Sequence, residues 1–112
     1  MSKLKIVLGV TGGIAAYKAI DLASRLFKEG FQVRTVFTEA AAKFVSPINF
    51  AAITHESVHD SLWEDDDPIP HISLADWADL VVIAPATANT IAKAVAGISD
   101  NLLSSILLAH TK

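Results

Sequence analysis

The chain has 112 residues, 52% of them hydrophobic and 19% charged, so it holds enough apolar material for one core and too little for two. Its formal net charge of −3 is spread over mixed acidic and basic residues, which argues against nucleic acid or an anionic membrane as a partner. It has no cysteine, which excludes disulfides and thiolate metal sites, and no apolar run approaches the roughly 20 residues that span a bilayer. We therefore expect one cytoplasmic domain, or a piece of one.

The first forty residues predict a strand, a glycine turn, a helix and a second strand. Residues 5–10 are apolar and β-branched, as in a strand that is covered on both faces of a parallel sheet. After the glycine turn at 11–13, apolar residues recur at helical spacing over 14–29, and Gly30 offers a left-handed cap. Residues 31–37 return to a strand pattern, which completes a βαβ unit with a right-handed crossover.

The middle of the chain predicts a short helix, a loop and a third strand. Ser46 as N-cap and Pro47 at the first helical position lead into an apolar helix over 48–53. Residues 55–70 contain an acidic run and two prolines, which indicates an exposed loop. Residues 80–84 are continuously apolar and predict a third buried strand.

Two helices are predicted in the last part of the chain. Residues 87–96 have helical content closed by Gly97, and Asp100 is placed to cap a last helix over 102–107. Strands that alternate with helices in this way predict a three-layer α/β fold with a parallel sheet. In such folds ligands bind at the carboxyl ends of the strands, so we expect the chemistry in the loops that follow the three strands.

The first of these loops, 11–15, is a candidate phosphate site. Its glycines allow close backbone approach, and free amide groups at a helix start favour an anion. A tight strand-to-helix turn also uses glycine without any ligand, so both interpretations stay open at this point. The segment fits neither the G-x-G-x-x-G dinucleotide fingerprint nor the P-loop pattern, in which a lysine directly follows the glycine; here Lys18 comes later.

The other two loops carry hydroxyl and amide side chains. Thr38 follows the second predicted strand and is placed either to cap the next helix, which is the commoner use, or to reach a ligand. The segment 84–90 brings two threonines and an asparagine to the end of a very apolar strand. That position favours ligand contact over helix capping.

His71 is a candidate acid or base, because it stands just after the acidic loop and an imidazole exchanges its proton near neutral pH. A lone loop histidine is more often polar surface, so spacing alone makes catalysis the minority interpretation. The acidic run 64–67 lacks the glycine-containing loop of a calcium site. We therefore predict no metal.

Taken together, five segments resemble the flavin-containing cysteine decarboxylase family. In chain order they are residues 12–18, 70–72, 77–80, 84–90 and 97–102. One glycine turn is a weak signal, but five blocks in order over almost the whole chain are specific. The resemblance implies a Rossmann-like, flavodoxin-like architecture with FMN at the strand ends, and a trimer or an assembly of trimers with active sites between subunits.

The resemblance also implies roles for individual residues. FMN would be held by residues from the three loops: Gly12, Gly13, Ile14, Ala15, Thr38, Phe44, Thr87, Ala88, Asn89 and Thr90. His71 would be the catalytic histidine and take a proton from the substrate. The implied reaction is the FMN-dependent decarboxylation of 4'-phosphopantothenoylcysteine to 4'-phosphopantetheine in coenzyme A biosynthesis, in which the cofactor supplies the electron sink that an amino acid carboxylate lacks.

Departures from the family leave alternatives open. The family's P-x-M-N motif and the cysteine of its substrate flap are absent from these 112 residues. We therefore expect residues 1–112 to form one incomplete FMN-binding domain, truncated at the carboxyl end, that does not complete turnover alone. A decarboxylase of a peptide's carboxyl-terminal cysteine and a non-catalytic flavin-binding regulatory subunit are the two main alternatives. A dinucleotide-binding half-domain is disfavoured by the missing fingerprint.

Overall fold

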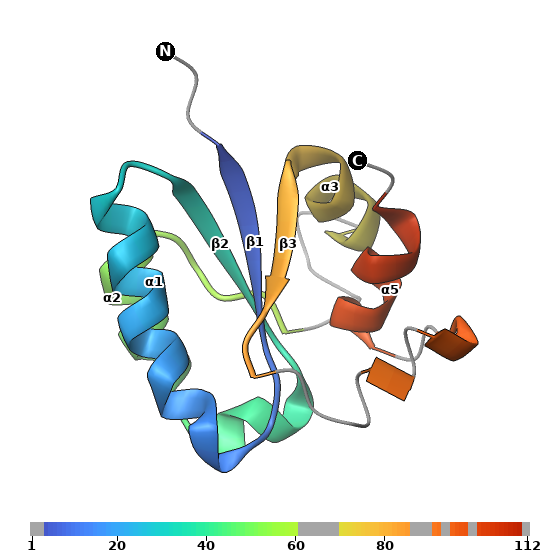
Figure 1. The fold of residues 1–112 in the computed structure, drawn as a ribbon, viewed down its shortest axis with the longest axis horizontal. Coiled ribbons are helices and arrows are strands. Elements are labelled where there is room, and N and C mark those ends of the chain that lie inside the picture. The colour runs from blue at the N-terminus through green and yellow to red at the C-terminus, as the bar shows by residue number, and fades with distance from the viewer. Residues whose placement is uncertain (1–3, 61–69, 86–90, 93–94, 99–100, 111–112) are drawn as a thin grey trace.

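The computed structural model describes residues 4–60, 70–85, 91–92, 95–98 and 101–110. Three parallel strands form a sheet in the order β2-β1-β3: β1 (Lys5–Val10), β2 (Gln32–Phe37) and β3 (Leu80–Ile83). The helices are η1 (Ile14–Tyr17), α1 (Lys18–Lys28), η2 (Glu39–Lys43), α2 (Pro47–Thr54), α3 (Pro70–Trp77) and α5 (Leu102–Ala109). Helices α1 and α2 cover one face of the sheet and α3 and α5 the other (Figure 1), which confirms the predicted three-layer α/β fold.

The sheet has a continuous parallel register. Lys5 lies beside Gln32 and Val10 beside Phe37, so β1 and β2 pair over their whole length. On the other side of β1, four consecutive residues pair with all of β3. The carboxyl ends of the three strands therefore lie at one edge, where the sequence places the candidate loops.

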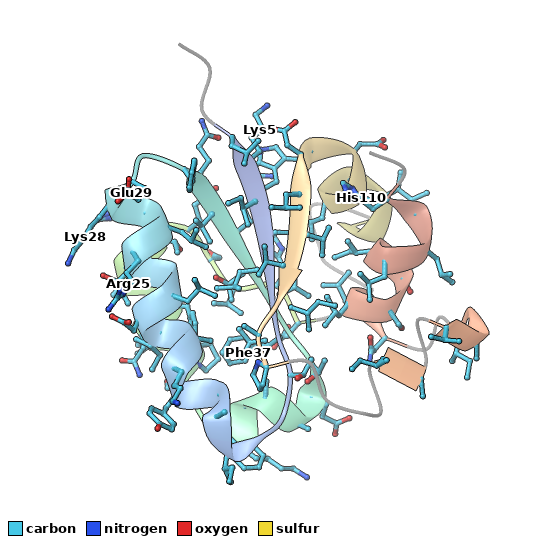
Figure 2. All side chains as sticks on the ribbon, viewed as in Figure 1. Lys5, Arg25, Lys28, Glu29, Phe37 and His110 are labelled. Carbon is cyan, nitrogen blue, oxygen red and sulfur yellow. The ribbon has the colours of Figure 1, made fainter. Side chains whose placement is uncertain are left out.

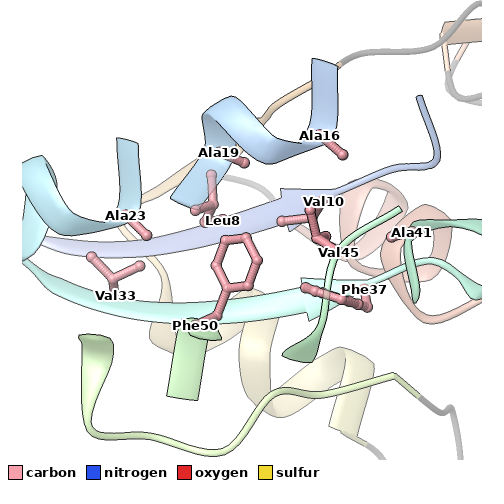
Figure 3. Close-up of a cluster of buried hydrophobic side chains, with 10 residues drawn as sticks. All are labelled: Leu8, Val10, Ala16, Ala19, Ala23, Val33, Phe37, Ala41, Val45 and Phe50. Carbon is pink, nitrogen blue, oxygen red and sulfur yellow. The ribbon is translucent and has the colours of Figure 1, made fainter. Parts of the chain in front are cut away.

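The first core lies between the sheet and helices α1 and α2 (Figure 3). Its buried members are Leu8, Val10, Ala16, Ala19, Ala23, Val33, Phe37, Ala41, Val45 and Phe50. The three alanines of η1 and α1 share one helix face, and their small side chains let the helix lie close to the strands. The rings of Phe37 and Phe50 meet edge to face with their centroids 5.2 Å apart, which attaches α2 to β2.

The second core lies between the sheet and helices α3 and α5. Its buried members are Val7, Val36, Leu74, Ala75, Ala78, Leu102, Leu103 and Ile106. A Cβ atom on Gly9 would lie 2.6 Å from Cδ1 of Leu103, whose side chain is fully buried. This glycine, the last residue of β1 but one, therefore makes the room that α5 needs to pack against the sheet.

The predicted helix over 14–29 is present, but its first turn is the 3-10 helix η1 rather than α-helix. Gly30 has a φ of 93°, in the left-handed region that only glycine adopts readily, as predicted for the residue after this helix. The second helix begins at Pro47 as expected, although the side chain of Ser46 makes no capping bond. In the described residues no helix is long and apolar enough to cross a membrane.

Two predictions in the last part of the chain need correction. Strand β3 is not buried: Leu80 is exposed and the next three residues are half-buried, because β3 pairs with β1 on one side and no described strand lies on the other. The N-cap of the last helix is Asn101, whose Oδ1 accepts a bond of 2.8 Å from the amide of Ser104. The predicted cap, Asp100, lies outside the described residues. Gly97 has the positive φ, 72°, expected of a helix end.

Thr35 is an uncompensated polar group in the first core. It lies in β2 on the same face as Val33 and Phe37, and its buried Oγ1 has no hydrogen-bond partner. Thr35→Val keeps the shape and removes the desolvated hydroxyl, so we expect the free energy of unfolding to rise by about 1–2 kcal/mol. Urea denaturation measures this change.

The matched control for that substitution is Thr54→Val. Thr54 is also buried, but its hydroxyl donates a bond of 2.9 Å to the carbonyl of Phe50. Removing a satisfied bond should lower the free energy of unfolding by about 1 kcal/mol. Equal destabilisation by both substitutions would show that the Thr35 hydroxyl is satisfied in solution.

Candidate functional site

The three strands end together at what we call the carboxyl edge, the edge of the sheet at Val10, Phe37 and Ile83. Figure 1 shows β3 pointing towards this edge, with the start of the first helix and η2 on the same side of the molecule. In open parallel sheets covered by helices, ligands bind outside this edge. The structure therefore brings the loops after all three strands to one place.

Hydrogen bonds between these loops fix their relative positions. The amide of Thr38 donates to the carbonyl of Val10 at 3.0 Å, and the Thr38 hydroxyl lies 3.5 Å from the same oxygen. The buried hydroxyl of Thr11 donates to the carbonyl of Pro85, which joins the end of β1 to the segment after β3. Thr38 does precede η2, but its side chain makes no capping hydrogen bond. Helix capping, the commoner of the two roles expected from the sequence, is therefore not observed.

The glycine turn, residues 11–13, runs directly into a helix. Gly13 has φ −169° and ψ 157°, which is extended backbone that any residue adopts, and its carbonyl accepts from the amide of Ala16 at 2.9 Å. No side chain caps this helix start. The first amides of a helix have no partner within the helix, and those of Ile14 and Ala15 lie on exposed residues, so they are available to an anion.

Exposed apolar side chains accompany these amide groups. Ile14 is 87% exposed at the start of η1, and Phe44 is 48% exposed at the end of η2. Both segments lie at the carboxyl edge. A ligand that has both a phosphate and a flat aromatic ring would bind its phosphate at the helix start and its ring against such apolar side chains.

Not every predicted site residue falls in the described part of the chain. The structure brings Gly12, Gly13, Ile14 and Ala15 together with Thr38 and Phe44 at the carboxyl edge. The predicted residues Thr87, Ala88, Asn89 and Thr90 lie outside the described residues.

His71 is placed differently from the prediction. It belongs to the first turn of α3 rather than to a loop. Pro70 at the first helical position was the signal for this helix start, of the same kind as Pro47 in α2.

One polar contact at the carboxyl edge was not anticipated from the sequence. Thr11 and Pro85 are 74 positions apart, and no spacing rule connects a strand end to a carbonyl so far along the chain. The only local indication of this contact in the sequence was a hydroxyl directly after a buried strand.

Within the described residues, no group of three His, Asp or Glu side chains is placed to hold a metal ion.

A cavity of about 340 Å³ lies elsewhere in the molecule. It is lined by Phe27, Gly30, Phe31, Gln32, Val33, Thr54, His55 and Glu56. Gln32 and Val33 begin β2, so this cavity is at the amino end of the strands; Figure 2 shows Glu29 near that end and Phe37 near the other. Because parallel sheets bind ligands at the carboxyl ends, we do not assign the candidate site to this cavity.

Comparison with known proteins agrees with this geometry. Residues 1–112 match the family described as Flavoprotein. The coenzyme A biosynthesis bifunctional protein CoaBC of Bacillus subtilis (strain 168) is 44% identical over an alignment of 113 positions. The alignment covers 99% of this chain and 28% of that protein. The chain therefore spans little more than a quarter of the length of this curated relative.

Solved structures are similar as well. The FMN-dependent cysteine decarboxylase SpaF superposes with a TM-score of 0.88 at 32% identity, over 96% of this chain and 63% of that one. A PPC decarboxylase mutant complexed with pantothenoylaminoethenethiol superposes with a TM-score of 0.81 at 32% identity, over 96% of this chain and 61% of that one.

Proposed function

Because the chain belongs to the flavoprotein family, we propose that it binds FMN at the carboxyl edge and is the cofactor-binding part of a phosphopantothenoylcysteine decarboxylase. The observation that carries the proposal is the helix start after the glycine turn, which no side chain caps, at the edge where all three strands end. The names of the relatives support the reaction, since one acts in coenzyme A biosynthesis and another is a PPC decarboxylase.

The residues at the carboxyl edge fit this cofactor. The amides of Ile14 and Ala15 would bind the phosphate, and the exposed side chains of Ile14 and Phe44 would contact the flavin ring. Thr38 would add a hydroxyl between them. Thr87 to Thr90 would complete the site. These residues follow Pro85, whose carbonyl oxygen accepts the hydrogen bond from the Thr11 hydroxyl at the end of β1.

The chemistry divides between cofactor and chain. Bound FMN would supply a reversible electron sink, without which the loss of carbon dioxide from an ordinary amino acid carboxylate leaves an unstabilised carbanion. His71 would take a proton from the substrate at an imidazole nitrogen. The substrate is then a small molecule that carries a cysteine carboxylate, and the site would lie between subunits of a trimer, or of an assembly of trimers, in the cytoplasm.

The oligomeric state of the complete protein is a separate part of the proposal. A monomeric mass of the complete protein by light scattering would remove the trimer from the proposal.

The first experiment is the visible absorption spectrum of the purified complete protein, with the released cofactor identified by mass. We expect FMN in a one-to-one ratio with the chain. A colourless protein that also fails to take up added FMN would contradict the proposal. Carbon dioxide release from phosphopantothenoylcysteine is then compared with release from a peptide that ends in cysteine. This comparison separates the proposed reaction from that of a peptide decarboxylase, which the likeness to a solved peptidyl-cysteine decarboxylase keeps as the second candidate.

A further inference from the structure

We infer that Ala40 is a positioning residue of the FMN site and acts through Gly12. The inference rests on the proposed function. The observation behind it is a close approach between two loops: a Cβ atom on Gly12 would lie 2.5 Å from the Cβ of Ala40, 3.0 Å from its carbonyl carbon and 3.1 Å from its carbonyl oxygen. Gly12 therefore lacks a side chain because η2 occupies the space, independently of any ligand.

The η2 side of this contact is anchored. Ala41, next to Ala40, is fully buried in the first core, and the carbonyl of Ala41 accepts bonds from the amides of Phe44 and Val45. Two of the three atoms of Ala40 nearest to the missing Cβ belong to the main chain. The nearest atom, the Cβ of Ala40 at 2.5 Å, is attached directly to the main chain, so it gives way only if the anchored segment shifts, which costs far more than turning a flexible side chain.

On the other side of the contact, Gly12 is held at the residue before it but not at the residue after it. Thr11, the residue before Gly12, is buried and bonded through its hydroxyl to Pro85. The residue after it, Gly13, begins the exposed helix start. Strain introduced at Gly12 would therefore be relieved towards η1, whose first amides are the proposed phosphate donors, and away from Phe44 on η2.

The contact between Gly12 and Ala40 thus sets the spacing between the two parts of the FMN site. The phosphate donors lie at the start of η1, and Phe44 lies at the end of η2. Hydrogen bonds to a phosphate weaken steeply once distance and angle depart from their best values. The size of the side chain at position 40 should therefore control flavin affinity although Ala40 need not touch the flavin.

The test is a double-mutant cycle in the complete protein with FMN as the probe. Gly12→Ala should raise the Kd for FMN by about 10- to 100-fold, as expected for an overpacked contact. Ala40→Gly in the same chain should restore a large part of that affinity by removing the nearest opposing atom. The matched control is Ala42→Gly with Gly12→Ala, because Ala42 is exposed in the same 3-10 helix and its replacement loosens the backbone equally.

Measurements on the FMN-free protein separate a structural from a positioning role. Denaturation of the same set of variants should show coupling between positions 12 and 40 without any flavin. If Gly12→Ala does not fold, recovery of folded protein with Ala40→Gly but not with Ala42→Gly supports the contact.

Three results would overturn the inference. They are equal rescue by the two glycine substitutions, no rescue by either, and coupling in stability while the Kd for FMN stays at its original value in Gly12→Ala. Failure of the unsubstituted protein to bind FMN would instead remove the proposed function on which the inference rests.

Discussion

Replacing His71 by asparagine is expected to leave bound flavin in place and to slow carbon dioxide release from phosphopantothenoylcysteine by about 10²- to 10⁴-fold. Asparagine has a polar amide in place of the imidazole but cannot take up a proton near neutral pH. Position 71 lies in the first turn of α3, where asparagine is tolerated, so the helix should persist. Carbon dioxide release and the flavin absorbance of the same sample measure the two expectations.

The control for this experiment is His55→Asn. His55 ends α2 with a φ of 61°, a left-handed conformation that asparagine adopts more readily than most residues, and it lines the cavity at the amino end of the strands. Its substitution should leave both turnover and flavin content unchanged. Undiminished turnover in His71→Asn would remove His71 from the mechanism, and loss of flavin there would assign it a binding role instead.

Gly13→Asp is expected to expel the flavin. The extended φ of Gly13 accepts any residue, so the effect of the substitution comes from the new side chain rather than from the backbone. A carboxylate at this helix start would meet the phosphate of FMN, and two like charges about 4 Å apart near a protein surface repel by about 4 kcal/mol. The Kd for FMN, measured by the quenching of flavin fluorescence, should rise by about a thousandfold.

The matched variant Gly13→Asn has nearly the same shape without the charge. It should weaken FMN binding by less than about tenfold, because only the size of the side chain changes. Equal losses in the two variants would mean that space, and not charge, excludes the cofactor. Normal flavin content in Gly13→Asp would show that the phosphate binds elsewhere.

The sequence by itself determined the elements whose signals are local. The strand at 5–10, the helix that ends before Gly30 and the helix that starts at Pro47 are all present as predicted. Each depends on a pattern within a few residues, such as continuous apolar character, helical spacing or a residue with a restricted φ. The same kind of pattern placed the glycine turn between a strand and a helix, and with it the candidate phosphate site.

Signals of the same local kind also failed where neighbours decide the outcome. The apolar run at 80–84 correctly predicted a strand, but its burial depends on what lies at both edges, and β3 is half-exposed. His71 was expected in a loop because the acidic residues before it dominate the composition, whereas it belongs to α3. The strand or helix propensity of a segment depends on its own residues, whereas its burial depends on the elements that pack around it.

Only the tertiary structure decided why particular small and polar residues stand where they do. Gly9 makes room for Leu103, Gly12 for Ala40, and the hydroxyl of Thr11 bonds the carbonyl of Pro85. The partners in these contacts lie between 28 and 94 positions apart, by subtraction of their residue numbers. The sequence shows only that a glycine or a threonine is present, because which atoms it must avoid or bond is set by packing segments that are distant along the chain.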